Sequence, residues 1–259
     1  MRMRIQRLIG TSALVITVAT GAGCSTAADD STVSTPGPSQ APQAPATIPS
    51  DPVAALAAAK AHLGTESARF ARDTEPDMLD FTGIVNAETR NWEIHGKEYA
   101  VRRIGTDLYV RASGKALKSL LVSPTTIDRL AAGGWARTRL PNGRELSTVF
   151  NDRFPWNLTN PAMSATGITR TGDRSFSGTV SITVGKNGSR PQTKKLPLRV
   201  DLDDRGRITT VGLSADPASP DRRTYFTFSD FGVRADITAP PPVDVVEEDN
   251  PSFLADLGL

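Results

Sequence analysis

Cysteine and histidine are both scarce in this sequence, and their scarcity excludes several kinds of site. Cys24 is the only cysteine among 259 residues, so no disulfide can form within the chain and the folded part must be stabilised by burial of its core. The two histidines, His62 and His95, are not spaced against a cysteine, an aspartate or each other as a metal site or a catalytic triad requires. We therefore expect no metal site, no cofactor and no enzymatic activity.

The sequence also lacks nucleotide-binding and hydrolase motifs, and it has no large excess of charge. No Gly-x-Ser-x-Gly elbow and no Gly-rich phosphate loop occurs, because the glycines stand singly in turns. Lysine and arginine number 30 against 28 aspartates and glutamates, and no basic cluster is interleaved with aromatic residues. Nucleic acid is therefore not expected as a partner.

No hydrophobic run is long enough to cross a membrane. The apolar run Leu8 to Ala19 has roughly 12 residues, which is too short for a hydrocarbon core of ~30 Å. It follows Arg2, Arg4 and Arg7 and ends on small residues directly before Cys24. This pattern is typical of a signal peptide, and the cysteine at its end predicts a lipobox over residues 1–23 with Cys24 lipidated.

One position departs from a usual lipobox. Gly21 stands where leucine or valine is commoner, so cleavage of a plain signal peptide after Ala22 or Ala28 is the alternative. With lipidation, the protein is expected on the extracytoplasmic face of the cell membrane, attached through the lipid anchor.

The next segment and the end of the chain differ from the middle in composition. Residues 24–50 are dominated by Ala, Ser, Thr, Pro and Gln without apolar periodicity, which predicts a disordered tether after the lipidated cysteine. The folded domain is expected over residues 51–243. Residues 244–259 form an acidic, loosely held tail in this interpretation.

Within the domain, apolar residues recur first at helical and then at strand spacing. Asp51 and Pro52 begin a helix that runs to Leu63, and Gly64 ends it. Helices are also expected over 115–121, 123–132 and 145–154. Alternation of apolar and polar residues predicts strands over 67–72, 79–85, 92–95, 99–101, 108–111, 135–140, 180–184, 196–202, 208–213, 226–228 and 233–237.

These elements predict an α+β fold with a strongly curved antiparallel β-sheet. A sheet that is polar on one face and apolar on the other needs a cover for its apolar face. Only the few helices are available for this purpose, so we expect a half-barrel with helices covering its concave face.

Two segments carry a resemblance to a known family. They are the stretch Tyr225-Phe-Thr-Phe-Ser-Asp-Phe-Gly-Val-Arg-Ala-Asp-Ile-Thr-Ala-Pro-Pro and the stretch Gly105-Thr-Asp-Leu-Tyr-Val-Arg111, the latter followed by Gly134-Trp135. With the lipobox and the tether, residues 51–243 resemble the actinobacterial LppX/LprG-type lipoproteins and, more distantly, LolA and LolB. The resemblance implies a half-barrel whose hydrophobic cavity holds acyl chains and which performs no chemistry on its cargo, so it gives no catalytic residues.

The apolar positions of the predicted strands are the candidate lining of such a cavity. They are Phe70, Leu79, Phe81, Ile94, Val101, Leu108, Val110, Trp135, Val180, Ile182, Leu198, Val200, Phe226 and Phe228. The same residues form an ordinary core if the helices fill the concave face. Asp201, Asp203 and Asp204 are interpreted as a hairpin turn, since a hard cation needs more oxygen ligands.

Two hypotheses of function follow. The first is a membrane-anchored carrier of a lipid, a lipoglycan or another acylated molecule, acting as a monomer, with an envelope transporter protein as a partner. The second is a surface interaction or sensor module whose core is filled by its own side chains and which binds a protein partner.

Overall fold

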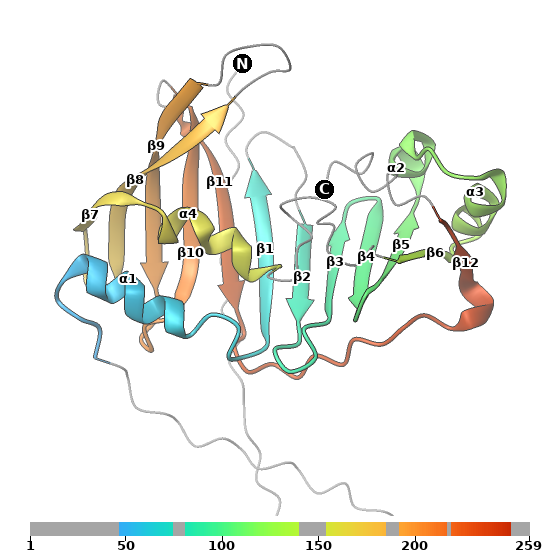
Figure 1. Cartoon of the computed structure of the whole chain (residues 1–259), viewed down its shortest axis with the longest axis horizontal. Helices are drawn as coiled ribbons and strands as arrows, with labels where there is room; N and C mark the ends of the chain where they lie inside the picture. Colours follow the sequence, from blue (N-terminus) through green and yellow to red (C-terminus); the bar gives the residue numbers. More distant parts are fainter. Residues whose placement is uncertain (1–46, 75–80, 140–153, 185–191, 217–218, 250–259) are drawn as a thin grey trace, which may run out of the picture. The chain divides into compact units, whose positions relative to one another are not determined.

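The computed structural model describes residues 47–74, 81–139, 154–184, 192–216 and 219–249 (Figure 1). All of them belong to one compact unit, residues 44–259. The predicted signal peptide, Cys24, most of the tether and Leu79 lie outside the described residues. The helix predicted over 145–154 also lies outside the described residues, except for its last residue, Phe154.

The first half of the unit is one helix followed by five strands, two helices and a sixth strand. These elements are α1 (Pro52–Ala61), β1 (Ala68–Thr74), β2 (Phe81–Val85), β3 (Trp92–Gly96), β4 (Tyr99–Ile104), β5 (Asp107–Ala112), α2 (Gly114–Ser119), α3 (Pro124–Ala131) and β6 (Trp135–Arg139). The second half contributes η1 (Trp156–Thr159), α4 (Asn160–Met163), β7 (Thr166–Arg170), β8 (Ser175–Val184), β9 (Gln192–Leu202), β10 (Ile208–Asp216), β11 (Ser219–Ser229), η2 (Pro242–Asp244) and β12 (Val245–Glu247).

Helix α1 begins where the sequence predicts, and for the predicted reason. The Asp51 carboxylate accepts the amide of Ala54 at 2.7 Å, and Pro52 occupies a position that needs no amide hydrogen. Ala55, Leu56 and Ala59 are the buried residues of the helix. Helix α3 begins in the same way: the Ser123 hydroxyl accepts the Thr126 amide at 3.2 Å, and Pro124, which has no amide hydrogen, stands in the first turn.

All twelve strands of the described chain join one sheet in the order β12-β6-β5-β4-β3-β2-β1-β11-β10-β9-β8-β7. Every neighbouring pair is antiparallel except β12 and β6, which are parallel. The sheet is open, with β7 and β12 at its edges. The structure is therefore α+β with one large, mostly antiparallel sheet, which confirms the fold class predicted from the sequence.

The predicted strand over 233–237 is wrong. Residues 233–237 belong to no strand, although Ala235 and Ile237 are buried. The reason is that β11 already has a neighbour on each side: β1 pairs with it from Arg69↔Ser229 to Thr74↔Thr224, and β10 pairs with its other edge. The segment is attached through side chains instead, since the amide of Asn86 donates to the Ala235 carbonyl at 2.9 Å.

The beginning of the predicted acidic tail packs on the sheet. Val245, Val246 and Glu247 form β12 and pair with β6. Glu248, which follows, is 9% exposed, and its carboxylate accepts the hydroxyl of Thr126 at 2.9 Å and the amide of Ser123 at 3.3 Å. In the described chain, residues 244–249 are thus held by the N-terminus of α3.

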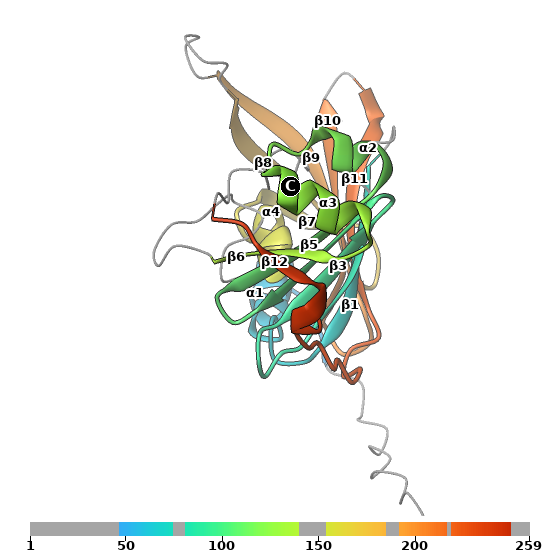
Figure 2. The same cartoon turned by 90° about the vertical axis from the view of Figure 1, so that its right-hand side faces the viewer.

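The register of the strands divides the sheet into two faces. We call the face that bears Phe70, Ile94, Val110 and Val200 the covered face, because α1 and α4 pack over β8–β10 there and α2 and α3 pack over β4–β6. Figure 2 shows α1 and α4 on one side of β1 and β11. We call the opposite face, which bears Trp135, the bare face.

Candidate ligand-binding site

The centre of the covered face is filled by the side chain of Phe154. Its ring lies 5.4 Å from that of Phe70, 6.4 Å from that of Phe81 and 4.7 Å from that of Trp92, measured between centroids. All four residues are at most 3% exposed. The pairs with Phe70 and Trp92 are edge-to-face, and such pairs contribute about 0.5–1.5 kcal/mol each beyond their buried area. Here the sheet therefore contacts protein side chains rather than an open cavity.

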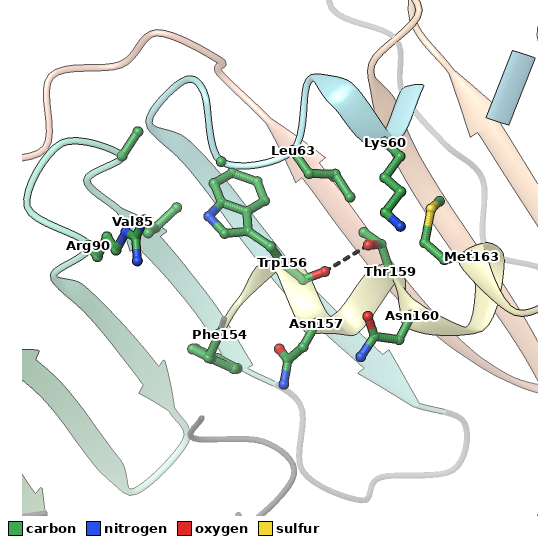
Figure 3. Close-up of a pocket in the computed structure, with 12 residues that line it drawn as sticks. Lys60, Leu63, Val85, Arg90, Phe154, Trp156, Asn157, Thr159, Asn160 and Met163 are labelled. Atoms are coloured by element: carbon green, nitrogen blue, oxygen red, sulfur yellow. Dashed lines mark hydrogen bonds between the residues drawn. The ribbon is translucent and has the colours of Figure 1, made fainter. Parts of the chain in front are cut away.

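A pocket of about 510 Å³ begins beside this aromatic cluster (Figure 3). It lies between the C-terminal end of α1, the segment η1–α4, and the turn that joins β2 to β3. Its twelve described lining residues are Lys60, Leu63, Gly64, Val85, Ala87, Arg90, Phe154, Trp156, Asn157, Thr159, Asn160 and Met163. The volume is within the range of about 300–1,000 Å³ that is typical of small-molecule sites.

Trp156 forms one wall of the pocket, and two neighbours constrain its position. Its indole stacks on Phe228 with centroids 5.5 Å apart and an angle of 15°. Gly64 approaches the same indole so closely that a Cβ atom at Gly64 would lie 3.3 Å from Nε1. The Thr159 hydroxyl donates to the Trp156 carbonyl at 2.7 Å and holds the turn of η1 (Figure 3).

Arg90 enters the pocket from the β2–β3 turn in an unusual backbone conformation. Its φ of 58° lies in the left-handed region, which non-glycine residues rarely adopt. The turn is fixed around it, because Asn86 Oδ1 accepts the amides of Glu88 and Thr89, each at 2.9 Å. Asn91 Oδ1 accepts the amide of Gly105 at 3.1 Å on the other side of Arg90. These hydrogen bonds hold the backbone from which the Arg90 side chain extends.

The described lining of the pocket carries two cations, Lys60 and Arg90, and no carboxylate. Both cationic side chains are exposed. In Figure 3 the Trp156 indole lies between Arg90 on one side and Lys60 on the other. The apolar part of the lining comes from Leu63, Val85, Phe154, Trp156 and Met163. The pocket therefore combines an apolar wall with positive charge at its margins.

Among the described residues that the sequence proposes as cavity lining, none belongs to the lining of this pocket; Leu79 lies outside the described residues. Ten of them pack in the two hydrophobic clusters of the covered face: Phe70, Phe81, Ile94, Val101, Leu108, Val110, Leu198, Val200, Phe226 and Phe228. Val180 lies on the same face, buried opposite Leu196, and Ile182 pairs with Lys194 and is only partly buried. Leu198 also borders a separate hollow of about 380 Å³ on the sheet. Sequence reasoning missed the pocket because its walls come from a helix end, a hairpin turn and the 154–163 segment, which have no strand periodicity.

Trp135 lies on the bare face, so it cannot line a cavity on the covered face. The next residue, Ala136, pairs with Val110 and packs in the core of the covered face, and alternation turns Trp135 to the other side. There the guanidinium groups of Arg102 and Arg111 each lie 5.0 Å from the centroid of its indole. Two cation–π contacts and the bidentate Arg102–Glu93 pair explain how a large aromatic residue is tolerated there.

The histidines and the acidic turn have structural surroundings. His62 caps the C-terminus of α1 and is exposed, and His95 Nε2 lies 3.0 Å from Glu93 Oε1. Burial would raise the pKa of Asp203, but hydrogen bonds from the Arg207 side chain and from the amides of Arg207 and Arg205 outweigh it and hold the pKa below the usual aspartate value. Among the described residues, no group of three or more metal-ligating side chains is found.

The helices of the described chain are too short or too polar to cross a membrane. Comparison with known proteins gives no family. No protein-family model and no curated protein matches the chain. Among solved structures, it is similar to a DUF1329 family protein from Desulfovibrio piger, with 11% sequence identity and a TM-score of 0.26 over 73% of this chain and 96% of the other. Such a weak structural match carries no argument about function, and the resemblance to the LppX/LprG-type lipoproteins stays a prediction.

Proposed function

We propose that this protein is an exported lipoprotein, anchored to the membrane through Cys24, that binds a lipid or another acylated molecule in the pocket between α1, η1–α4 and the β2–β3 turn. The observation that carries the proposal is the pocket itself, which has about 510 Å³ of space and an apolar wall adjoining the hydrophobic core. We further propose that the sheet acts as a half-barrel of the LppX/LprG type and that the cargo is carried without chemical change.

The energetics favour an acyl chain over a purely polar ligand. Apolar surface removed from water contributes about 25 cal/mol per Å². Leu63, Trp156 and Met163 offer such surface to a ligand, and each is only partly buried by the protein itself. A chain segment that covers these side chains would gain several kcal/mol, at roughly 0.8 kcal/mol per buried methylene group.

The binding test uses a variant that fills the pocket. The chain, extracted mildly from membranes, is examined by native mass spectrometry for bound lipid, and the emptied protein is titrated with a fluorescent fatty acid. Ala87→Phe places a ring in the pocket lining and is expected to abolish binding. Ala58→Phe adds the same ring to an exposed position of α1 and is expected to leave binding unchanged. Protein that carries no lipid and binds no probe contradicts the proposal.

The second candidate function is an interaction module with a protein partner. The packing of Phe154 among Phe70, Phe81 and Trp92 favours it, because the middle of the covered face is already filled. A stoichiometric protein partner recovered after crosslinking on intact cells, together with an empty pocket in native mass spectrometry, would replace the first proposal by this one.

A further inference from the structure

The described lining of the pocket carries charge of one sign only, from Lys60 and Arg90. Several arginines on the sheet lie against carboxylates, as in the pairs Arg102–Glu93 at 2.9 Å, Arg137–Glu247 at 2.7 Å and Arg207–Asp203 at 2.7 Å. Within the described ranges, neither Lys60 nor Arg90 forms an ion pair. Glu88 of the same turn is exposed and does not line the pocket. Two cations without a protein counter-charge therefore border one hollow.

The backbone at Arg90 indicates that its side chain matters at this position. A non-glycine residue in the left-handed region is strained, and glycine or asparagine adopts that conformation at lower cost. The hydrogen bonds of Asn86 and Asn91 hold the turn in shape without help from the Arg90 side chain. Backbone strain at a residue that lines a pocket supports the hypothesis that its side chain contacts a ligand.

A hollow with apolar walls and one sign of charge concentrates ions of the opposite sign. Field lines from Lys60 and Arg90 are focused where protein replaces water, which favours an anion at the margin of the pocket. The partly buried side chains of Leu63, Trp156 and Met163 offer a surface for an apolar chain next to it. The two features together fit a molecule that has an acidic head and a hydrocarbon chain.

We propose that the pocket selects anionic amphiphiles, with a carboxylate or phosphate head group bound by Lys60 and Arg90 and the hydrocarbon chain lying on Trp156. This inference rests on the proposed lipid-binding function and adds the charge of the cargo. The guanidinium of Arg90 can donate two parallel hydrogen bonds to either head group, and Lys60 supplies a point charge.

The test compares ligands that share one chain and differ only in the head. Oleate, oleyl alcohol and oleylamine are titrated against the full chain, with intrinsic tryptophan fluorescence and calorimetry as readouts. We expect oleate to bind at least tenfold more tightly than oleyl alcohol, and oleylamine more weakly still. In the double variant Lys60→Gln/Arg90→Gln, the oleate preference is expected to fall to within threefold while the affinity for oleyl alcohol is unchanged.

A matched control removes the same amount of charge elsewhere. Lys195→Gln/Arg174→Gln changes two exposed cations outside the pocket lining and is expected to keep the full preference for oleate. Thermal unfolding of both double variants confirms that they are folded. Oleoyl lysophosphatidate tests a phosphate head on the same chain, and inorganic phosphate tests the free anion.

The outcomes separate this inference from the proposed function. Equal binding of oleate and oleyl alcohol by the unmodified chain overturns the anionic preference and leaves lipid binding intact. Binding of none of the chain-bearing ligands overturns both. Displacement of oleate by micromolar inorganic phosphate also overturns the inference, because the site would then be one for a small free anion.

Discussion

At the scale of single residues, Gly64 joins helix geometry to the wall of the pocket. Its φ is +77°, and a Cβ atom there would press on the indole of Trp156 at 3.3 Å. Gly133 has a φ of +82° with open space around it, so it is a matched control for the backbone strain alone. Both Gly64→Ala and Gly133→Ala are expected to lower the free energy of unfolding by about 1–2 kcal/mol.

Only Gly64→Ala is expected to displace Trp156. The difference is measured by tryptophan fluorescence and by the affinity for a fluorescent fatty acid, and Gly64→Ala should change both. If both variants, or neither, shift the emission spectrum, the contact between Gly64 and Trp156 does not determine the position of the indole.

Asp203 gives the fold a dependence on pH. Hydrogen bonds from Arg207 and Arg205 hold its folded-state pKa below the usual value of about 3.9 in spite of partial burial. Its contribution to stability is therefore complete above that value and is lost as the pH falls through the folded-state pKa. Asp203→Asn is expected to lower the free energy of unfolding at pH 7 by about 1–2 kcal/mol.

Urea unfolding at pH 7 and at pH 3 tests this expectation. The loss should shrink at pH 3, where the unmodified chain begins to lose the charge as well. Asp204→Asn alters the exposed neighbour in the same turn and should have little effect at either pH. An equal loss for Asp203→Asn at both pH values would show that the charge plays no part.

At the scale of elements, the segment from Phe154 to Met163 holds the covered face together. Phe154 packs among Phe70, Phe81 and Trp92, Trp156 stacks on Phe228, and α4 contacts α1, β9 and β10. Phe154→Ala is expected to lower the free energy of unfolding by about 3–5 kcal/mol, because it leaves a cavity in a close-packed cluster. Phe154→Leu keeps most of the volume and should cost considerably less.

Chemical denaturation of the two variants provides the measurement. A small loss for Phe154→Ala, similar to that for Phe154→Leu, would mean that the cluster collapses around the missing ring. The filled centre of the covered face would then contribute little to the stability of the sheet.

Alternation of apolar and polar residues predicts the strands that have a clear period-two pattern. β2 to β5 and β8 to β10 follow period-two patterns in the sequence, and the helix caps at Asp51 and Ser123 act as their residue types predict. The sequence does not disclose that β1 pairs with β11, which leaves residues 233–237 without a strand edge. It also does not disclose β12, since three residues are too few for a periodic signal.

The candidate site escapes sequence reasoning for a related reason. Alternation identifies which side chains face a core, but the pocket is bounded by a helix end, a turn and η1–α4. The only signals there are local ones: the tryptophan at position 156, and Arg90 in a turn flanked by Asn86 and Asn91. Neither signal indicates a binding site by itself, because only the fold brings Lys60, Arg90 and Trp156 around one pocket.

At the scale of the whole molecule, the lipid anchor is the prediction with the clearest cellular consequence. A thiol is needed to form the thioether to diacylglycerol, and Ser cannot replace it. Cys24→Ser is therefore expected to move the protein from the membrane fraction to the soluble extracytoplasmic fraction, while Ser25→Ala stays with the membrane. The distribution is read by fractionation and immunoblotting. A Cys24→Ser protein that remains membrane-bound would require another mode of attachment.

The pairing of β1 with β11 has a consequence for how the chain is made. Phe70 faces Phe228 in this pair, so β11, the second-to-last strand of the described chain, is needed to complete the surroundings of the first. During synthesis, more than half of the chain must follow β1 before its second neighbour exists. Contacts between such distant parts of a sequence form late and slowly. This delay suits the export proposed above, because the finished sheet cannot assemble while the C-terminal third of the chain is still being made.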